Sequence, residues 1–192
     1  MSFDLIRLCV RIVSMEERKA SSAPAAQETQ KIVSAGIIVF RHTEEGVKFL
    51  ILYHGGDYWN FPKGKLEVAE RSYQAAFREV REETGLKQSE LKLVGDFKAF
   101  EKFYFKRGSE KIFKVVILYL AETKQSRITL SHEHEGYGWF TFLQAKKMLA
   151  HHKDNLRILQ QAFAYLQNPT QGKASAQNRP ASPVAHPKRF SA

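Results

Sequence analysis

Residues 64–86 carry the pattern that most constrains this chain, reading GKLEVAERSYQAAFREVREETGL. A helix beginning near Ser72 turns about 100° per residue. Its last turn then carries three carboxylates, from Glu79, Glu82 and Glu83, on one arc. The adjacent arc is expected to hold the packing residues Tyr73, Ala76, Phe77, Val80 and Thr84.

Three carboxylates within one helical turn repel one another, and each neighbouring pair costs roughly 0.2–0.5 kcal/mol. A hard cation among the oxygens relieves this repulsion, and Mg²⁺ is bound in proteins by a few carboxylates together with substrate phosphates. Arg78 can orient one carboxylate through a bidentate pair, and Glu70 can fold back toward the same patch. The alternative is a charged amphipathic helix on the surface that binds nothing.

The stretch follows the spacing G-x(5)-E-x(7)-R-E-U-x-E-E-x-G-U, where U is apolar. The positions that match are Gly64, Glu70, Arg78, Glu79, Val80, Glu82, Glu83, Gly85 and Leu86. At ordinary residue frequencies a chance match has a probability on the order of one in ten million. Because this spacing is the Nudix box, the chain resembles the Nudix hydrolases over about residues 31–167. The resemblance implies an α+β fold, a mixed β-sheet sandwiched between helices with a loop-helix-loop catalytic motif.

Nudix hydrolases cleave a nucleoside diphosphate linked to another moiety, and the resemblance implies the same reaction with Mg²⁺ or Mn²⁺ as cofactor. Bound metal neutralises phosphate charge and activates a water, and a carboxylate takes the proton of that water. The implied metal ligands are Glu79, Glu82, Glu83, the Gly64 carbonyl and Glu70. The implied catalytic residues are Glu79, Glu82, Glu133 and Arg78, and the choice of general base stays open.

Three further segments resemble the asymmetrical diadenosine tetraphosphate hydrolase branch, in which water releases ATP and AMP. They are WNFPKG at residues 59–64, LAE at 120–122 and LSHEHEGYGW at 130–139. Lys65 and Leu66 stand where that branch often has His and Val. This departure resembles mRNA-decapping and RNA pyrophosphohydrolase relatives, so the 5′ end of RNA is an alternative substrate. A module that senses a nucleotide without cleaving it is a third hypothesis, which the intact carboxylate set disfavours.

Aromatic and basic residues outside the helix are candidates for holding the substrate. A base stacked on an aromatic ring contributes roughly 1–3 kcal/mol, and lysines bind phosphates as point charges. The candidates are Trp59, Lys63, Lys65, Tyr104, Arg107 and Phe163. Tyr104 is preferred to Phe103 as the stacking residue. Core packing is an alternative role for Trp59, and solvation is one for the lysines.

Apolar runs outside the box predict the remaining elements. Strands are expected over residues 32–40, 47–53, 91–100, 111–121 and 137–140, with the first two forming a hairpin. Helices are expected over residues 142–150 and 154–166, the second with Leu156, Leu159, Gln160 and Phe163 on one face. His132 and His134 are spaced for one face of a strand, with too few nitrogen or sulfur ligands nearby for a zinc site.

Composition separates both ends of the chain from this domain. Residues 1–30 are predicted to be a flexible N-terminal extension and linker, and residues 168–192 a basic disordered tail. The first fifteen residues fit an amphipathic helix, an organelle presequence or a sequence preceding a true start at Met15. The single cysteine, Cys9, excludes a disulfide framework. A cytoplasmic location is therefore expected, with organelle targeting as the alternative.

The formal net charge of +10 also bears on partners. A basic field around an acidic metal site suits a nucleoside polyphosphate, with RNA a possible partner, although a basic balance also serves solubility. No stretch approaches the roughly 18 apolar residues of a membrane span. The oligomeric state is left open.

Overall fold

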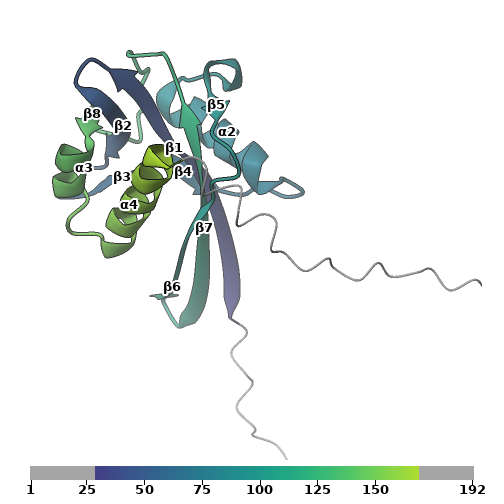
Figure 1. Ribbon diagram of the computed structural model, residues 1–192. Helices are drawn as coiled ribbons and strands as arrows, with labels where there is room; N and C mark the ends of the chain where they lie inside the picture. The colour runs from purple at the N-terminus through teal and green to yellow at the C-terminus, as the bar shows by residue number, and fades with distance from the viewer. Residues whose placement is uncertain (1–28, 169–192) are drawn as a thin grey trace, which may run out of the picture.

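A long strand, β1, organises the sheet of the computed structural model, which describes residues 29–168 (Figure 1). It pairs antiparallel with β2 and with β4, and parallel with β7 through registers such as Val33 with Val115. The sheet is therefore mixed, in the order β3-β2-β1-β7-β5, with β8 on β2 and β6 on β7. In chain order the elements are β1 (Gln30–Thr43), β2 (Gly46–Tyr53), β3 (Trp59–Asn60), β4 (Lys63–Lys65), α2 (Ser72–Thr84), a 3₁₀ turn η1 (Gln88–Glu90), β5 (Lys92–Leu93), β6 (Ala99–Arg107), β7 (Glu110–Glu122), β8 (Gly136–Thr141), α3 (Phe142–Met148) and α4 (Lys153–Gln167).

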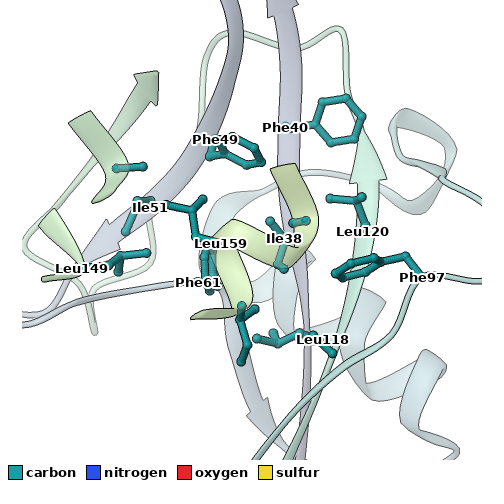
Figure 2. Packing of buried hydrophobic residues seen from close by; sticks show 14 of the residues in the cluster. Ile38, Phe40, Phe49, Ile51, Phe61, Phe97, Leu118, Leu120, Leu149 and Leu159 are labelled. Carbon is teal, nitrogen blue, oxygen red and sulfur yellow. The ribbon is translucent and has the colours of Figure 1, made fainter. Parts of the chain in front are cut away.

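Helices cover both faces of the sheet, because β1 is apolar on both sides. Ile37 and Val39 point into a cluster beneath α2. Ile38 and Phe40 point into a second cluster beneath α3 and α4, whose packing Figure 2 shows. Alternation along an extended strand sends successive side chains to opposite faces. An α+β fold with a mixed sheet between helices, as predicted, is thereby confirmed.

The catalytic-motif helix α2 begins and ends where the sequence predicts. Gly85 follows its last residue with φ +73°, the left-handed geometry expected at this position. The buried side differs slightly from the prediction, since Tyr73 is 41% exposed while Ala75 is buried. Two adjacent alanines, Ala75 and Ala76, let the helix lie close to β1, and Tyr73 falls at the edge of that contact.

Two sequence predictions of strands are wrong. The run 91–100 is not one strand: it holds the two residues of β5 and the first two of β6, because Gly95 turns the chain with φ +54° before β6 begins at Ala99. His132 and His134 lie in a turn that precedes β8, not on a strand.

The contact face of α4 is shifted by about one residue from the predicted one. Asn155, Ile158, Leu159 and Ala162 are its buried residues, whereas Gln160 is exposed. Sequence periodicity does not fix the angle at which a helix packs on its neighbours, and therefore does not fix which side chains make the contact.

The predictions for residues 1–30 and 168–192 fall almost entirely outside the described residues and remain predictions. The same holds for the alternatives given for residues 1–15 and for the expected location. Among the helices of residues 29–168, none has the length and apolar character needed to cross a membrane.

Leu159→Ala tests the docking of α4 on the sheet. Leu159 is fully buried in the cluster beneath this helix, so truncation should lower the free energy of unfolding by roughly 2–5 kcal/mol. The matched control is Leu143→Ala in α3, a leucine 69% exposed, which should change that free energy by no more than about 0.5 kcal/mol. Urea unfolding measures both; equal effects would contradict the described packing.

Candidate active site

Arg78 lies at the centre of the acidic motif. Its Nε and Nη2 donate to the two carboxylate oxygens of Glu70, at 3.0 and 2.9 Å. Its Nη1 donates to Glu79 at 2.8 Å and to Glu82 at 3.0 Å. Nη2 also donates to the Lys65 carbonyl at 3.0 Å, which ties the loop before the helix to the helix itself. The guanidinium lowers the pKa of Glu70 by hydrogen bonding.

The Glu79 carboxylate occupies the space that a side chain at position 64 would fill. Gly64 pairs with Ala35 of β1, and a Cβ built on it would overlap the Glu79 carboxylate. Absence of a side chain therefore lets the strand backbone approach this carboxylate closely. Burial raises the pKa of Glu79 despite the hydrogen bond from Arg78.

Glu83 is the most deeply placed carboxylate of the motif, 8% exposed as a residue. One oxygen accepts a hydrogen bond from the Lys63 backbone amide at 3.1 Å. The other lies 3.7 Å from Nε2 of His134. Burial raises the pKa of Glu83 to about 8, against the opposing effect of the Lys63 charge. The same burial lowers the pKa of Lys63.

A loop straps the end of α2 to the site. The backbone amides of Thr129 and Ser131 donate to the carbonyls of Thr84 and Glu83, at 3.0 and 3.1 Å. These carbonyls would otherwise lack partners at the helix end. The Ser131 hydroxyl lies 2.9 Å from Nδ1 of His134, and Nε2 of that ring is buried without a hydrogen-bond partner among residues 29–168. The loop therefore places an imidazole beside Glu83.

Several residues near Lys63 were not among the site residues predicted from the sequence. The His54 ring packs against that of His134 at a tilt of 59°, with ring centroids 4.4 Å apart, and burial lowers the pKa of His54 to about 4. Glu101 and Lys114 lie within electrostatic reach of Lys63, and burial raises the pKa of Glu101 and lowers that of Lys114. The signals for His134 were its spacing from His132 and its place in the LSHEHEGYGW segment; the others join the site only through strand pairing.

The remaining substrate-binding candidates are spread over the molecule. Trp59 packs on Tyr53 at 4.8 Å, in line with the alternative of core packing. Phe163 stacks on Phe142 at 4.1 Å, so that face of its ring is already covered. Lys65 is exposed beside the loop.

Two candidates lie on the β6–β7 hairpin. Arg107 is exposed at the end of β6, and Tyr104 is 60% exposed. Glu101, near Lys63, shares a strand face with Phe103, whereas Tyr104 points to the opposite face. Phe103 rather than Tyr104 is therefore on the side of the site. The exposed Glu133 lies next to His134 and within electrostatic reach of Glu83.

The donor set of this site fits a hard divalent cation. Its atoms are carboxylate and carbonyl oxygens, the ligands Mg²⁺ prefers, and partial loss of hydration raises the pKa of the Glu79 and Glu83 carboxyls. Within the described part of the chain, no three His, Cys, Asp or Glu side chains are grouped closely enough to hold a metal. The carboxylates are instead turned toward Arg78 and the Lys63 amide.

Comparison with known proteins decides the family. The NUDIX domain family matches residues 30–162. The chain belongs to the Nudix family. The Nudix fold and the class of pyrophosphohydrolase predicted from residues 64–86 are thereby confirmed.

Several Nudix relatives match over most of the domain. The asymmetrical bis(5′-nucleosyl)-tetraphosphatase of Mus musculus is 34% identical over 143 residues, which is 69% of this chain and 94% of that protein. An RNA pyrophosphohydrolase of Legionella pneumophila is 29% identical over 117 residues, covering 54% of this chain and 67% of its own. The crystal structure of a C. elegans Ap4A hydrolase binary complex superposes with a TM-score of 0.61 at 27% identity, covering 71% of this chain and 98% of that one.

Gly64→Ala tests the close approach of β4 to the catalytic helix. The added methyl group must displace the Glu79 carboxylate, the end of a flexible side chain, from its hydrogen bond with Arg78, so the free energy of unfolding should fall by roughly 0.5–1.5 kcal/mol, the usual net value of a hydrogen bond. Gly136→Ala is the control, because its methyl group meets only ordinary contacts with Tyr53. Urea unfolding compares the two variants, and a Gly64→Ala protein as stable as the control would contradict the geometry.

Glu83→Gln tests the cost of the buried carboxylate in metal-free protein. The folded-state pKa of Glu83 is about 8, above its ordinary 4.5, so the charged form destabilises the fold progressively from about pH 4.5 to 8. Glutamine still accepts the Lys63 hydrogen bond but carries no charge. The variant should be more stable than the wild type at pH 8, by on the order of 1 kcal/mol or more, and the gain should vanish near pH 4.5. A pH-independent difference would contradict this account.

Proposed function

We propose that this Nudix hydrolase cleaves bis(5′-nucleosyl) tetraphosphates asymmetrically and depends on a divalent metal. The observation that carries the proposal is the buried Glu83 carboxylate beside Lys63. Glu83 lies in the last turn of α2, a helix that also contains Glu79 and Glu82. A polyphosphate needs both cations for its oxygens and carboxylates for its metal. The similarity to asymmetrical tetraphosphatases over 94% of their length supports the choice of substrate.

The residues of α2 and of the loop before it have different proposed roles. Glu79, Glu82 and Glu83, with the Gly64 carbonyl and Glu70 as further oxygens, would hold Mg²⁺ or Mn²⁺. The bound metal supplies charge neutralisation of the phosphates and acidifies a water. Arg78 keeps the carboxylates on one side of the helix.

Groups outside the box complete the proposed site. The Lys63 ammonium, already buried among Glu83, Glu101 and Glu79, binds phosphate oxygens. Glu82 and Glu133 are the carboxylates open to solvent and are the candidates for taking the proton of the water. Phe103, on the same strand face as Glu101, is the aromatic ring that would stack on a base.

The second candidate activity is removal of phosphate from the 5′ end of RNA. It is favoured by the exposed Lys65, which follows the WNFPKG segment, and by the likeness to an RNA pyrophosphohydrolase over 54% of this chain. The two activities would share the metal site and would differ in the group that the protein must bind beyond the phosphates.

Product analysis separates these activities. The purified protein is incubated with Mg²⁺ and diadenosine tetraphosphate, 5′-triphosphorylated RNA or capped RNA. We expect ATP and AMP from the dinucleotide, complete loss of turnover with EDTA, and recovery with Mn²⁺. ADP as the product, or faster release of phosphate from RNA, would overturn the assignment of substrate; turnover in EDTA would overturn the metal dependence.

Glu79→Gln is the variant for this assay. This change removes the charge of a proposed metal ligand. Mutations of residues that only support a ligand lower activity by up to roughly 100-fold, so Glu79→Gln should lower kcat/KM by more than that. Glu44→Gln, at an exposed turn, is the control with the same chemical change and should retain full activity.

A further inference from the structure

The far end of the β6–β7 hairpin carries an exposed surface that the hydrolytic site does not use. Figure 1 shows this hairpin and the beginning of β1 projecting beyond the helices. Strand registers align three rows of side chains on one face: Lys31, Phe113 and Tyr104; Val33, Val115 and Lys102; Ala35, Ile117 and Phe100. Lys106 and Lys111 pair beyond the first row. We call this surface the hairpin platform.

The platform presents aromatic rings to solvent. Tyr104 is 60% exposed and Phe100 44% exposed, although a strand normally keeps such rings against a core. Tyr104 lies on Phe113 with ring centroids 4.7 Å apart and planes inclined by 32°. One face of Tyr104 is thus supported by a neighbour while the ring remains open to a ligand.

The charges of the platform are of one sign. Lys31, Lys102, Lys106 and Lys111 all belong to this face, whereas Glu101 and Glu110 belong to the opposite one by strand alternation. The lysines lie over the rings, with Lys111 Nζ 4.7 Å from the Tyr104 centroid and Lys102 Nζ 6.0 Å from that of Phe100. These ammonium groups therefore lie over ring faces on which a flat ligand could stack. The displaced lysines could then pair with the anionic groups of that ligand.

We propose that the hairpin platform binds single-stranded nucleic acid, with bases stacked on Tyr104 and Phe100 and phosphates on the surrounding lysines. Aromatic side chains on a sheet stack two or three bases in known RNA-binding modules, and a stacking surface inside a basic groove binds strands with little sequence preference. A protein partner fits less well, because lysine is depleted in protein–protein interfaces.

The platform is on the opposite face of the hairpin from the Lys63 side of the hydrolytic site. Glu101 and Lys114, which surround Lys63, lie on that other face. The inner edge of the platform is Ala35, which α2 covers and whose partner Gly64 lies against Glu79, whereas Tyr104 and the lysines belong to the rows away from this edge. Binding there does not rest on the proposed hydrolytic substrate, since a strand without any 5′ phosphate meets the same rings and lysines.

The test is fluorescence anisotropy of the full-length protein with a labelled single-stranded RNA that has a 5′ hydroxyl, which offers no phosphoanhydride to the hydrolytic site. Tyr104→Ala and Phe100→Ala should each weaken binding roughly five-fold to one hundred-fold, as loss of base stacking does. Tyr104→Phe keeps the ring and should bind like the wild type. Thermal melting of each variant shows that it folds.

Salt dependence tests the lysines separately. Replacing both Lys102 and Lys111 with alanine should reduce the slope of log K against log salt concentration by about 1.4, because each phosphate of a single strand that a lysine neutralises adds about 0.7 to that slope. The matched control replaces Lys146 and Lys147, two exposed lysines of α3, and should leave the slope unchanged.

Three results would overturn the proposal. The first is wild-type affinity in the folded alanine variants, and the second is an equal loss in the α3 control, which would indicate attraction by net charge alone. The third is no RNA binding at low salt together with a change of sedimentation coefficient in Tyr104→Ala, which would assign the platform to contacts between two copies of the chain.

Discussion

The site depends on the hydrogen bonds that the guanidinium of Arg78 donates to the carboxylates around it. Without this guanidinium, the carboxylates of Glu70, Glu79 and Glu82 would repel one another at the surface of one helix. With it, they converge on a single cation that also holds the Lys65 carbonyl. The loop that contains Gly64 is thereby fixed to α2, and α2 is fixed to the sheet by small buried residues. The position of the oxygens that converge on Arg78 follows from these two attachments.

Glu83 is a buried carboxylate that lies next to a lysine. Its carboxylate is buried next to a buried ammonium, which is costly for both charges and shifts the pKa of each toward the neutral form. Glu79 is turned to Arg78 and Glu83 to the Lys63 amide. Under the proposed function, a divalent cation would compete with these contacts. Its binding would then be coupled to that of a polyphosphate, which would supply anionic partners to Arg78 and Lys63.

Local patterns were enough to predict the elements that local chemistry determines. The helix over α2, its end at Gly85 and the hairpin of β1 and β2 follow from periodicity and turn residues. The surroundings of Lys63 do not, because His54 and Glu101 reach it only through pairings between distant strands. The preference for Tyr104 over Phe103 failed to place a ring on the side of Lys63 for a similar reason. A shift of one residue in a strand reverses the face, and the sequence of β6 is aromatic on both faces.

That two-sided character of β6 gives the hairpin two different surfaces without any additional element. Glu101, Phe103 and Phe105 alternate with Phe100, Lys102 and Tyr104, so one set faces the Lys63 side and the other faces solvent. A strand that only closed the core would be polar on its outer face. Phe100 and Tyr104 occupy that face among lysines instead, and the apolar area they leave in water contributes nothing to the stability of the described chain. The composition of the outer face is therefore better explained by a ligand than by folding.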